Sequence, residues 1–328
     1  MKIKIEAIEK YLPSKKVASF ELDDKCKAPR GRIEKNTGVA YRHYANTTET
    51  VCEMGANALK KALAKAHLQP IHLDLLISCS AAYDYPIPHN SVVIKSKITN
   101  DTSTFNCFDV DATCLSFLNT LDIAHLYLKT GKYKRIALVC SEIASLALTP
   151  QNEKVFGLFG DAAVAMIITS HETDGYEPLY CDFENFVSGA LLAKVPIGGA
   201  INRGMDETSE NPNFYFDMDG KSMIRLTQKH INNFTRKAEK QLNKRIADFD
   251  YCVTHQTSRW GNEFFLRNYQ VESHKVIETL QKYGNCIAAS IPLGLEELYN
   301  RNQILKNKDV FILGSGAGLT FGCMALRF

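Results

Sequence analysis

Two stretches with a shared pattern, KYKRIALVCS at residues 132–141 and KNKDVFILGS at residues 306–315, decide the fold of this chain. Each starts with charged or polar residues and continues as a short apolar run, which is typical of a buried β-strand. A second pair, IHLDLLISCS (71–80) and ADFDYCVTHQ (247–256), repeats at a similar distance; the offsets are 174 and 176 residues. Buried strands are common, so one match would mean little. Two matches at nearly one offset predict a duplicated half of βαβ type.

The segments around these strands alternate between helical and strand-like spacing of apolar residues. No Pro-, Ser- or Gly-rich linker divides the chain, so the halves are expected to meet directly, as residues 1–170 and 171–328. The stretch 171–215 is predicted to be rich in loops, and VFILG (310–314) to be the last core strand. The other expected elements are helices over 50–68, 88–98 and 223–244 and strands over 74–79, 105–110, 134–140, 162–169 and 250–254.

The composition is that of an ordinary globular protein of 328 residues, with 45% hydrophobic and 23% charged residues. The net charge of +3 gives no reason to expect nucleic acid or a membrane surface as a partner. No apolar run reaches the ~18 residues that a membrane helix needs, so a cytoplasmic protein is expected. The ten cysteines show no CxxC or CxxH spacing, which argues against a zinc site and for buried thiols in a reducing compartment.

One cysteine, Cys114 in DATCLSF (111–117), has different surroundings from the rest. An extended-looking stretch precedes it, and apolar residues at helical spacing follow it as far as Gly131. Cys114 is therefore expected where a strand passes into a helix N-terminus, whose dipole and free N–H groups favour a thiolate. Taken alone, a cysteine in an apolar context is more often a structural residue.

Three further stretches carry groups that could do chemistry: VTHQTSRW with His255, YGNCIAASIP with Asn285, and LGSGAGLTFG with its glycine-rich turn at 314–318. Each also has an ordinary structural interpretation. His255 could be a buried structural histidine, Asn285 a turn residue, and the glycines a tight turn. No lysine follows the glycines, so they do not form a phosphate-binding P-loop. The stretches indicate an active site only as a set.

In order along the chain, ATCLSF, FGLFGDAAVA, HQ, YGNCIAASIP and GAGLTFG resemble β-ketoacyl-acyl-carrier-protein synthase III and its relatives in the thiolase-like condensing-enzyme superfamily. The resemblance covers essentially the whole chain. It implies an α/β protein with the thiolase-like five-layered αβαβα fold, built from two pseudo-repeated halves. It further implies a homodimer that needs no metal or other cofactor.

By the same resemblance, Cys114 matches the nucleophile that takes an acyl group from coenzyme A or an acyl carrier protein. His255 and Asn285 match the pair that binds a malonyl thioester and promotes its decarboxylation. Gly318 matches the glycine whose N–H completes an oxyanion hole with that of Cys114. The implied reaction is a decarboxylative Claisen condensation, in fatty-acid-like or specialised, polyketide-type biosynthesis.

The chain departs from the family pattern at several positions expected to bind substrate. Trp260 stands where the family has an arginine associated with carrier-protein docking, and Arg259 comes one place early. The N-terminal third lacks the tryptophan that stacks on coenzyme A and offers Arg32 instead. Ile87 occupies a loop position that, in the family, reaches the partner's acyl pocket, often with an aromatic residue. These departures favour an unusual or longer primer over acetyl-coenzyme A.

Two other functions remain open. An acyltransferase would pass the acyl group from Cys114 to an alcohol or amine and would not need Asn285. A non-catalytic ketosynthase-like subunit of a complex would usually have lost the nucleophile. A degradative thiolase is disfavoured, because Cys323 comes too late to be its second cysteine.

Overall fold

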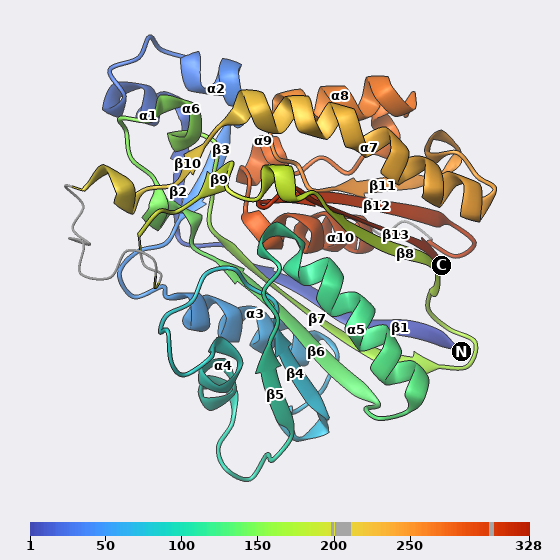
Figure 1. The fold of residues 1–328 in the computed structure, drawn as a ribbon. Coiled ribbons are helices and arrows are strands. Elements are labelled where there is room, and N and C mark those ends of the chain that lie inside the picture. The colour runs from blue at the N-terminus through green and yellow to red at the C-terminus, as the bar shows by residue number, and fades with distance from the viewer. Residues whose placement is uncertain (198–199, 201–210, 302–304) are drawn as a thin grey trace.

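A computed structural model describes residues 1–197, 200, 211–301 and 305–328 and contains two large mixed β-sheets (Figure 1). The first sheet has the order β1 (Lys2–Tyr11), β7 (Ala162–His171), β6 (Arg135–Glu142), β4 (Leu75–Ser78) and β5 (Asn106–Asp109). The second has the order β8 (Glu177–Asn185), β13 (Thr320–Arg327), β12 (Asp309–Gly316) and β11 (Tyr251–Thr254). In each sheet a parallel pair, β4–β6 in the first and β11–β12 in the second, is extended on one side by two antiparallel strands, β7 and β1 in the first and β13 and β8 in the second.

The strand registers confirm the duplication predicted from the sequence. Leu75 of β4 is paired with Ile136 of β6, and Tyr251 of β11 is paired with Val310 of β12. Tyr251 lies 176 residues after Leu75, and Val310 lies 174 residues after Ile136, which are the offsets of the two sequence matches. The aspartate before each first strand has the same role: the Asp74 carboxylate accepts the Arg135 N–H, and that of Asp250 accepts the Asp309 N–H.

Helices cover both faces of each sheet, which gives five layers (Figure 1). Between the sheets lie α5 (Ser116–Thr130) and α10 (Ser290–Asn300), whose apolar residues form one core with the inner faces of both sheets. The outer face of the first sheet is covered by α3 (Val51–Lys65) and α4 (Asn90–Ile98). The outer face of the second is covered by α7 (Gly220–Leu242) and α8 (Arg259–Tyr269).

The remaining helices and strands lie beside this layered core (Figure 1). They are β2 (Lys15–Ala18), α1 (Ser19–Lys25), α2 (Arg32–Thr37), β3 (Tyr41–Tyr44), α6 (Glu153–Phe156), β9 (Ala193–Lys194), β10 (Asp217–Met218) and α9 (Leu280–Tyr283). Among the described residues, no helix is long and apolar enough to span a bilayer.

The sequence prediction was wrong about two strands. The supposed loop region 171–215 contains β8, and residues 198–199 and 201–210 of it lie outside the described residues. The last core strand is β13, not VFILG. Most of β8 is half-buried, so its apolar and polar residues do not make a clean pattern. In β13, Gly322 interrupts the apolar run where the Phe183 ring packs over the strand.

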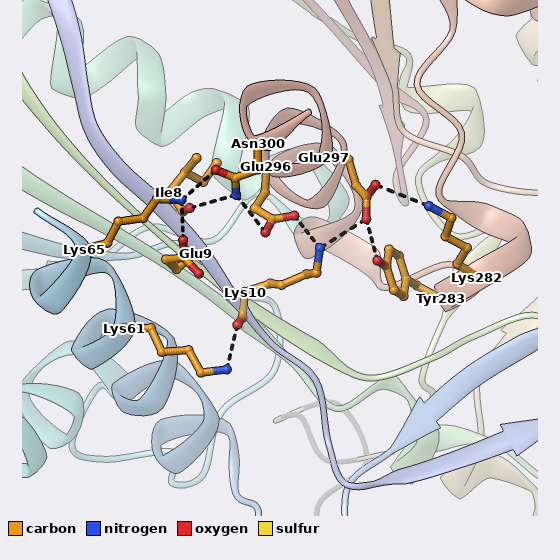
Figure 2. Close-up of polar contacts among 10 residues, drawn as sticks. All are labelled: Ile8, Glu9, Lys10, Lys61, Lys65, Lys282, Tyr283, Glu296, Glu297 and Asn300. Carbon is orange, nitrogen blue, oxygen red and sulfur yellow. Dashed lines mark hydrogen bonds and ion pairs between the residues drawn. The ribbon is translucent and has the colours of Figure 1, made fainter. Parts of the chain in front are cut away.

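An ion-pair network ties β1 of the first half to α10 of the second (Figure 2). Lys10 Nζ contacts Glu296 Oε2 at 2.5 Å and Glu297 Oε1 at 3.1 Å. The Tyr283 hydroxyl donates to Glu297 Oε1 at 2.6 Å, and Lys282 contacts the other oxygen of Glu297. Burial alone would raise the pKa of Glu297, but the hydrogen bonds from Tyr283 and Lys10 lower it to about 2. The network therefore anchors the residue that begins the Tyr-Gly-Asn turn.

Candidate active site

The Cys114 segment is a tight turn between β5 and α5. The Asp111 carboxylate accepts the Thr113 N–H at 2.7 Å, and the Ser116 hydroxyl oxygen accepts the Ala112 N–H at 2.9 Å. Thr113 has a left-handed backbone conformation with φ 53°, which is uncommon for a β-branched residue. These bonds and this conformation place Cys114 in the single turn of 3₁₀ helix that precedes α5.

The second half contains the same turn, and it carries Asn285. The Asn285 side-chain oxygen accepts the Ile287 N–H at 2.9 Å, and the Ser290 hydroxyl oxygen accepts the Cys286 N–H at 3.0 Å. Ile287 has φ 50°. Each residue lies 174 positions after its counterpart in the Cys114 turn, so Asn285 corresponds to Asp111 and Ala288 to Cys114.

The FGLFGD motif holds the Asn285 backbone in place. The Asn285 N–H donates to the Leu158 carbonyl at 2.9 Å, and the Gly160 N–H donates to the Asn285 carbonyl at 3.1 Å. A Cβ atom on Gly160 would lie 2.1 Å from the Tyr283 carbonyl oxygen, so only glycine fits there. This contact explains why the motif belongs with the site although it supplies no reactive side chain.

His255 follows β11 and faces two acceptors. Its Nδ1 lies 2.6 Å from the Ser315 carbonyl oxygen, and its Nε2 lies 3.2 Å from Asn285 Oδ1. The hydrogen bond from the Ile287 N–H fixes the Asn285 amide so that its oxygen faces the ring. Both ring nitrogens therefore face oxygen atoms, which can only accept hydrogen bonds. The doubly protonated ring would satisfy both, yet burial lowers the pKa of His255. His255 is therefore neutral in the resting protein and is positioned to gain a proton.

Burial also controls Cys114, against the expectation of a helix-activated thiolate. The residue is partly exposed, but protein atoms enclose its sulfur, and this burial raises the pKa of the thiol to about 12. The Ala317 N–H, the N–H of Cys114 itself and the Thr113 hydroxyl act in the opposite direction, but they are outweighed. A thiol with so high a pKa is protonated at neutral pH.

One cavity of about 570 Å³ contains Cys114, His255 and Asn285 in its lining. Its volume lies in the usual range for small-molecule sites, roughly 300–1,000 Å³. The rest of the lining is mainly apolar and comes from both halves of the chain. It includes Ile143, Leu148, Phe159, Phe216, Met223 and Phe264. The structure thus brings together the three residues that the sequence marked as a set, in a space suited to an apolar group.

The backbone N–H group that faces the Cys114 sulfur belongs to Ala317 rather than Gly318. Ala317 lines the cavity, whereas Gly318 is absent from its lining and supplies the left-handed turn, with φ 82°, that follows. The N–H that the sequence analysis assigned to the oxyanion hole, that of Gly318, is therefore not the one that the structure brings to the Cys114 sulfur.

The four residues expected to bind substrate are not brought together. Trp260 lines the cavity and stacks on Phe264, with ring centroids 5.2 Å apart. Arg259 lies outside the cavity and pairs with Glu263 at 2.9 Å. Arg32 likewise lies outside and pairs with Glu153 at 2.5 Å. Ile87 is 87% exposed on a surface loop and lines no part of the cavity in this single chain.

Sequence reasoning missed the role of Glu142, a fully buried carboxyl group. Its two oxygens accept the N–H groups of Ala81 and Ala82, at 2.7 and 3.1 Å, and these two alanines line the cavity. Burial raises the pKa of Glu142 to about 8. The Glu142 carboxyl thus holds the backbone of one wall of the cavity in place. The only sign of it in the sequence was a charged residue directly after the apolar run IALVCS.

Comparisons with known proteins identify the family of this chain. The family model described as 3-oxoacyl-[acyl-carrier-protein] synthase III matches residues 108–184, and its C-terminal counterpart matches residues 240–328. The chain is 28% identical over 327 residues to a β-ketoacyl-[acyl-carrier-protein] synthase III of Neisseria meningitidis, covering 99% of each chain.

Solved structures show the same fold. The 3-oxoacyl-[acyl-carrier-protein] synthase III of Aquifex aeolicus superposes with a TM-score of 0.87 at 25% identity, covering 99% of this chain and 100% of that one. The priming β-ketosynthase of the R1128 polyketide pathway superposes with a TM-score of 0.87 at 23% identity, covering 100% and 96%. The protein therefore belongs to the 3-oxoacyl-[acyl-carrier-protein] synthase III family of thiolase-like condensing enzymes.

Proposed function

We propose that this protein is a ketosynthase that joins an acyl group carried on Cys114 to a malonyl-type thioester by decarboxylative Claisen condensation. The observation that carries the proposal is the meeting of three groups in one cavity: the Cys114 thiol, the His255 ring and the Asn285 amide. Family membership supports it, because the curated relatives are named as synthases that use an acyl carrier protein.

In the first half-reaction the Cys114 sulfur attacks the carbonyl carbon of an acyl thioester. The thiol proton passes to neutral His255, whose ring then has a hydrogen for each of its two acceptors. A carbon–sulfur bond forms to Cys114, the bond to the donor's sulfur breaks, and the departing thiolate takes up a proton. The N–H groups of Cys114 and Ala317 are the donors for the oxyanion. One such donor is typically worth roughly 3–4 kcal/mol.

In the second half-reaction a malonyl-type thioester loses carbon dioxide and becomes an enolate. His255 and the Asn285 amide nitrogen stabilise the negative charge on its oxygen by donating hydrogen bonds. The enolate carbon attacks the acyl carbonyl, a carbon–carbon bond forms, and Cys114 leaves as a thiolate, which takes back the proton held by His255. Dividing the reaction at the acyl-enzyme separates one difficult step into two easier ones.

The partners we propose are an acyl carrier protein or coenzyme A as acyl donor, a malonyl thioester, and a second copy of this chain. Ile87 is almost fully exposed, as are Val187 at 87% and Leu191 at 74%. We propose that these side chains are covered in the dimer, because a contiguous apolar patch is typical of a protein interface. In a dimer, Ile87 would be the residue offered to the partner's cavity, and Trp260 would lie at the mouth where a carrier arm enters.

Intact-mass spectrometry tests the proposal directly. The protein is incubated with a panel of acyl-coenzyme A and acyl-carrier-protein thioesters, with Cys114→Ala as the control. We expect a mass gain that requires Cys114, discharged by a malonyl thioester with release of carbon dioxide. Discharge by an alcohol or amine alone would instead indicate an acyltransferase. Failure of every thioester to load Cys114 would favour a non-catalytic subunit.

A further inference from the structure

The Thr113 hydroxyl is a polar group next to the nucleophile that has no settled partner. Its oxygen is buried and makes no well-aligned hydrogen bond with any described residue. Thr113 lines the cavity together with Cys114. Gly316 lies so close to the Thr113 hydroxyl that a Cβ atom on it would be 2.9 Å from this oxygen. Burying a hydroxyl without a partner costs free energy, so this group calls for an acceptor, and the sulfur of the next residue, Cys114, is a candidate.

The duplicated turn shows that the backbone does not require this hydroxyl. Ile287 occupies the corresponding position in the second half, with φ 50° against 53° for Thr113. Both turns keep the same two hydrogen bonds: the first side chain of the turn, Asp111 or Asn285, accepts the N–H two residues on, and the serine hydroxyl at its end accepts the N–H four residues back. A β-branched apolar side chain is therefore compatible with this conformation. What distinguishes Thr113 from Ile287 is a hydroxyl, and it occurs in the half that carries the cysteine.

We propose that the Thr113 hydroxyl donates a hydrogen bond to the Cys114 sulfur when that sulfur becomes a thiolate, and so acts as a positioning residue for the nucleophile. The inference rests on the proposed role of Cys114. A thiolate is a better acceptor than a thiol, because hydrogen bonds to a charged acceptor are the stronger kind. The hydroxyl lies close enough to lower the pKa of the Cys114 thiol even in the resting protein. It compensates in part for the burial that opposes ionisation.

The test is the rate at which iodoacetamide alkylates Cys114 in the full-length protein, followed by intact mass between about pH 7 and 9. Alkylation of the other nine cysteines is subtracted with a Cys114→Ala version of each variant. Thr113→Val removes the hydroxyl and keeps the shape. We expect about tenfold slower alkylation at each pH, because the thiolate fraction falls by about that factor. Thr113→Ser should restore the wild-type rate to within about twofold.

The controls separate this role from packing and from the proposed function. Thr130→Val makes the same change at the exposed end of α5 and should leave the rate unaltered. Thr113→Ala serves if the valine variant does not fold. Equal rates for Thr113→Val and the wild type would overturn the inference, as would a serine variant that behaves like valine. Alkylation needs no substrate, so a result of either kind stands even if no thioester loads Cys114.

Discussion

Residues 111–116 and residues 285–290 form the same turn in the two halves of the molecule, yet they carry different chemistry. The first turn presents a cysteine, and the second presents alanine at that position. The second places an amide where the first has the Asp111 carboxylate, and it is this amide that meets His255. One backbone design has therefore been used twice, and the active site arises because the two copies differ in a few side chains.

The largest loss of activity is expected when Cys114 is replaced by alanine. Cys114→Ala makes the first turn resemble the second, which has Ala288 there and folds normally. We expect a folded protein with at least about 10³-fold lower condensation activity, since no covalent acyl-enzyme can form. Turnover with a malonyl thioester, together with a melting curve, measures both points. Retained activity would show that Cys114 is not the nucleophile.

The reverse exchange is Asn285→Asp, which makes the second turn resemble the first. An aspartate can still accept the Ile287 N–H, as Asp111 accepts that of Thr113, so the turn should persist. A carboxylate would repel the enolate, so condensation should fall by about 10²–10³-fold while Cys114 acylation continues. Separate assays of loading and of carbon dioxide release distinguish the two steps. Equal losses in both would contradict this division of labour.

The network between the halves should make stability depend on pH. Glu297 has its pKa lowered to about 2, so its contribution is present above the pKa of the unfolded chain, near 4.5, and is lost as the pH falls toward 2. Glu297→Gln should lower the free energy of unfolding at pH 7 by about 1–2 kcal/mol, after allowance for solvent screening. Chemical denaturation at pH 7 and pH 3 should show the difference shrinking. A difference that is constant with pH would rule out the ionised network as its cause.

The smallest expected effect concerns the loop between β4 and α4, which is longer than the equivalent connection between β11 and α8 in the second half. If Ile87 reaches the partner's cavity, Ile87→Phe should shorten it and shift the preferred acyl chain by roughly 10-fold toward shorter groups. Competition between short and long acyl thioesters for Cys114 measures this shift. An unchanged preference would place Ile87 outside the acyl pocket.

The duplicated fold could be predicted from the sequence, and so could the grouping of Cys114, His255 and Asn285, which line one cavity, because buried strands and ordered motifs are local patterns. Which N–H faces the sulfur was not predictable, since Ala317 and Gly318 differ only in how the turn directs them. The raised pKa of Cys114 was also missed, because it depends on packing from both halves. The strand β8 escaped notice because its half-buried residues lack a regular alternation.

The central claim is that the Asn285 turn drives condensation on an acyl group held by the Cys114 turn. The most direct test is a single-turnover experiment: wild type and Asn285→Asp are acylated on Cys114, freed of donor, and mixed with a malonyl thioester. The account predicts that the wild type loses its acyl group with one equivalent of carbon dioxide, whereas the variant stays acylated. Equally fast discharge of both proteins, or discharge of the wild type without carbon dioxide, would contradict it.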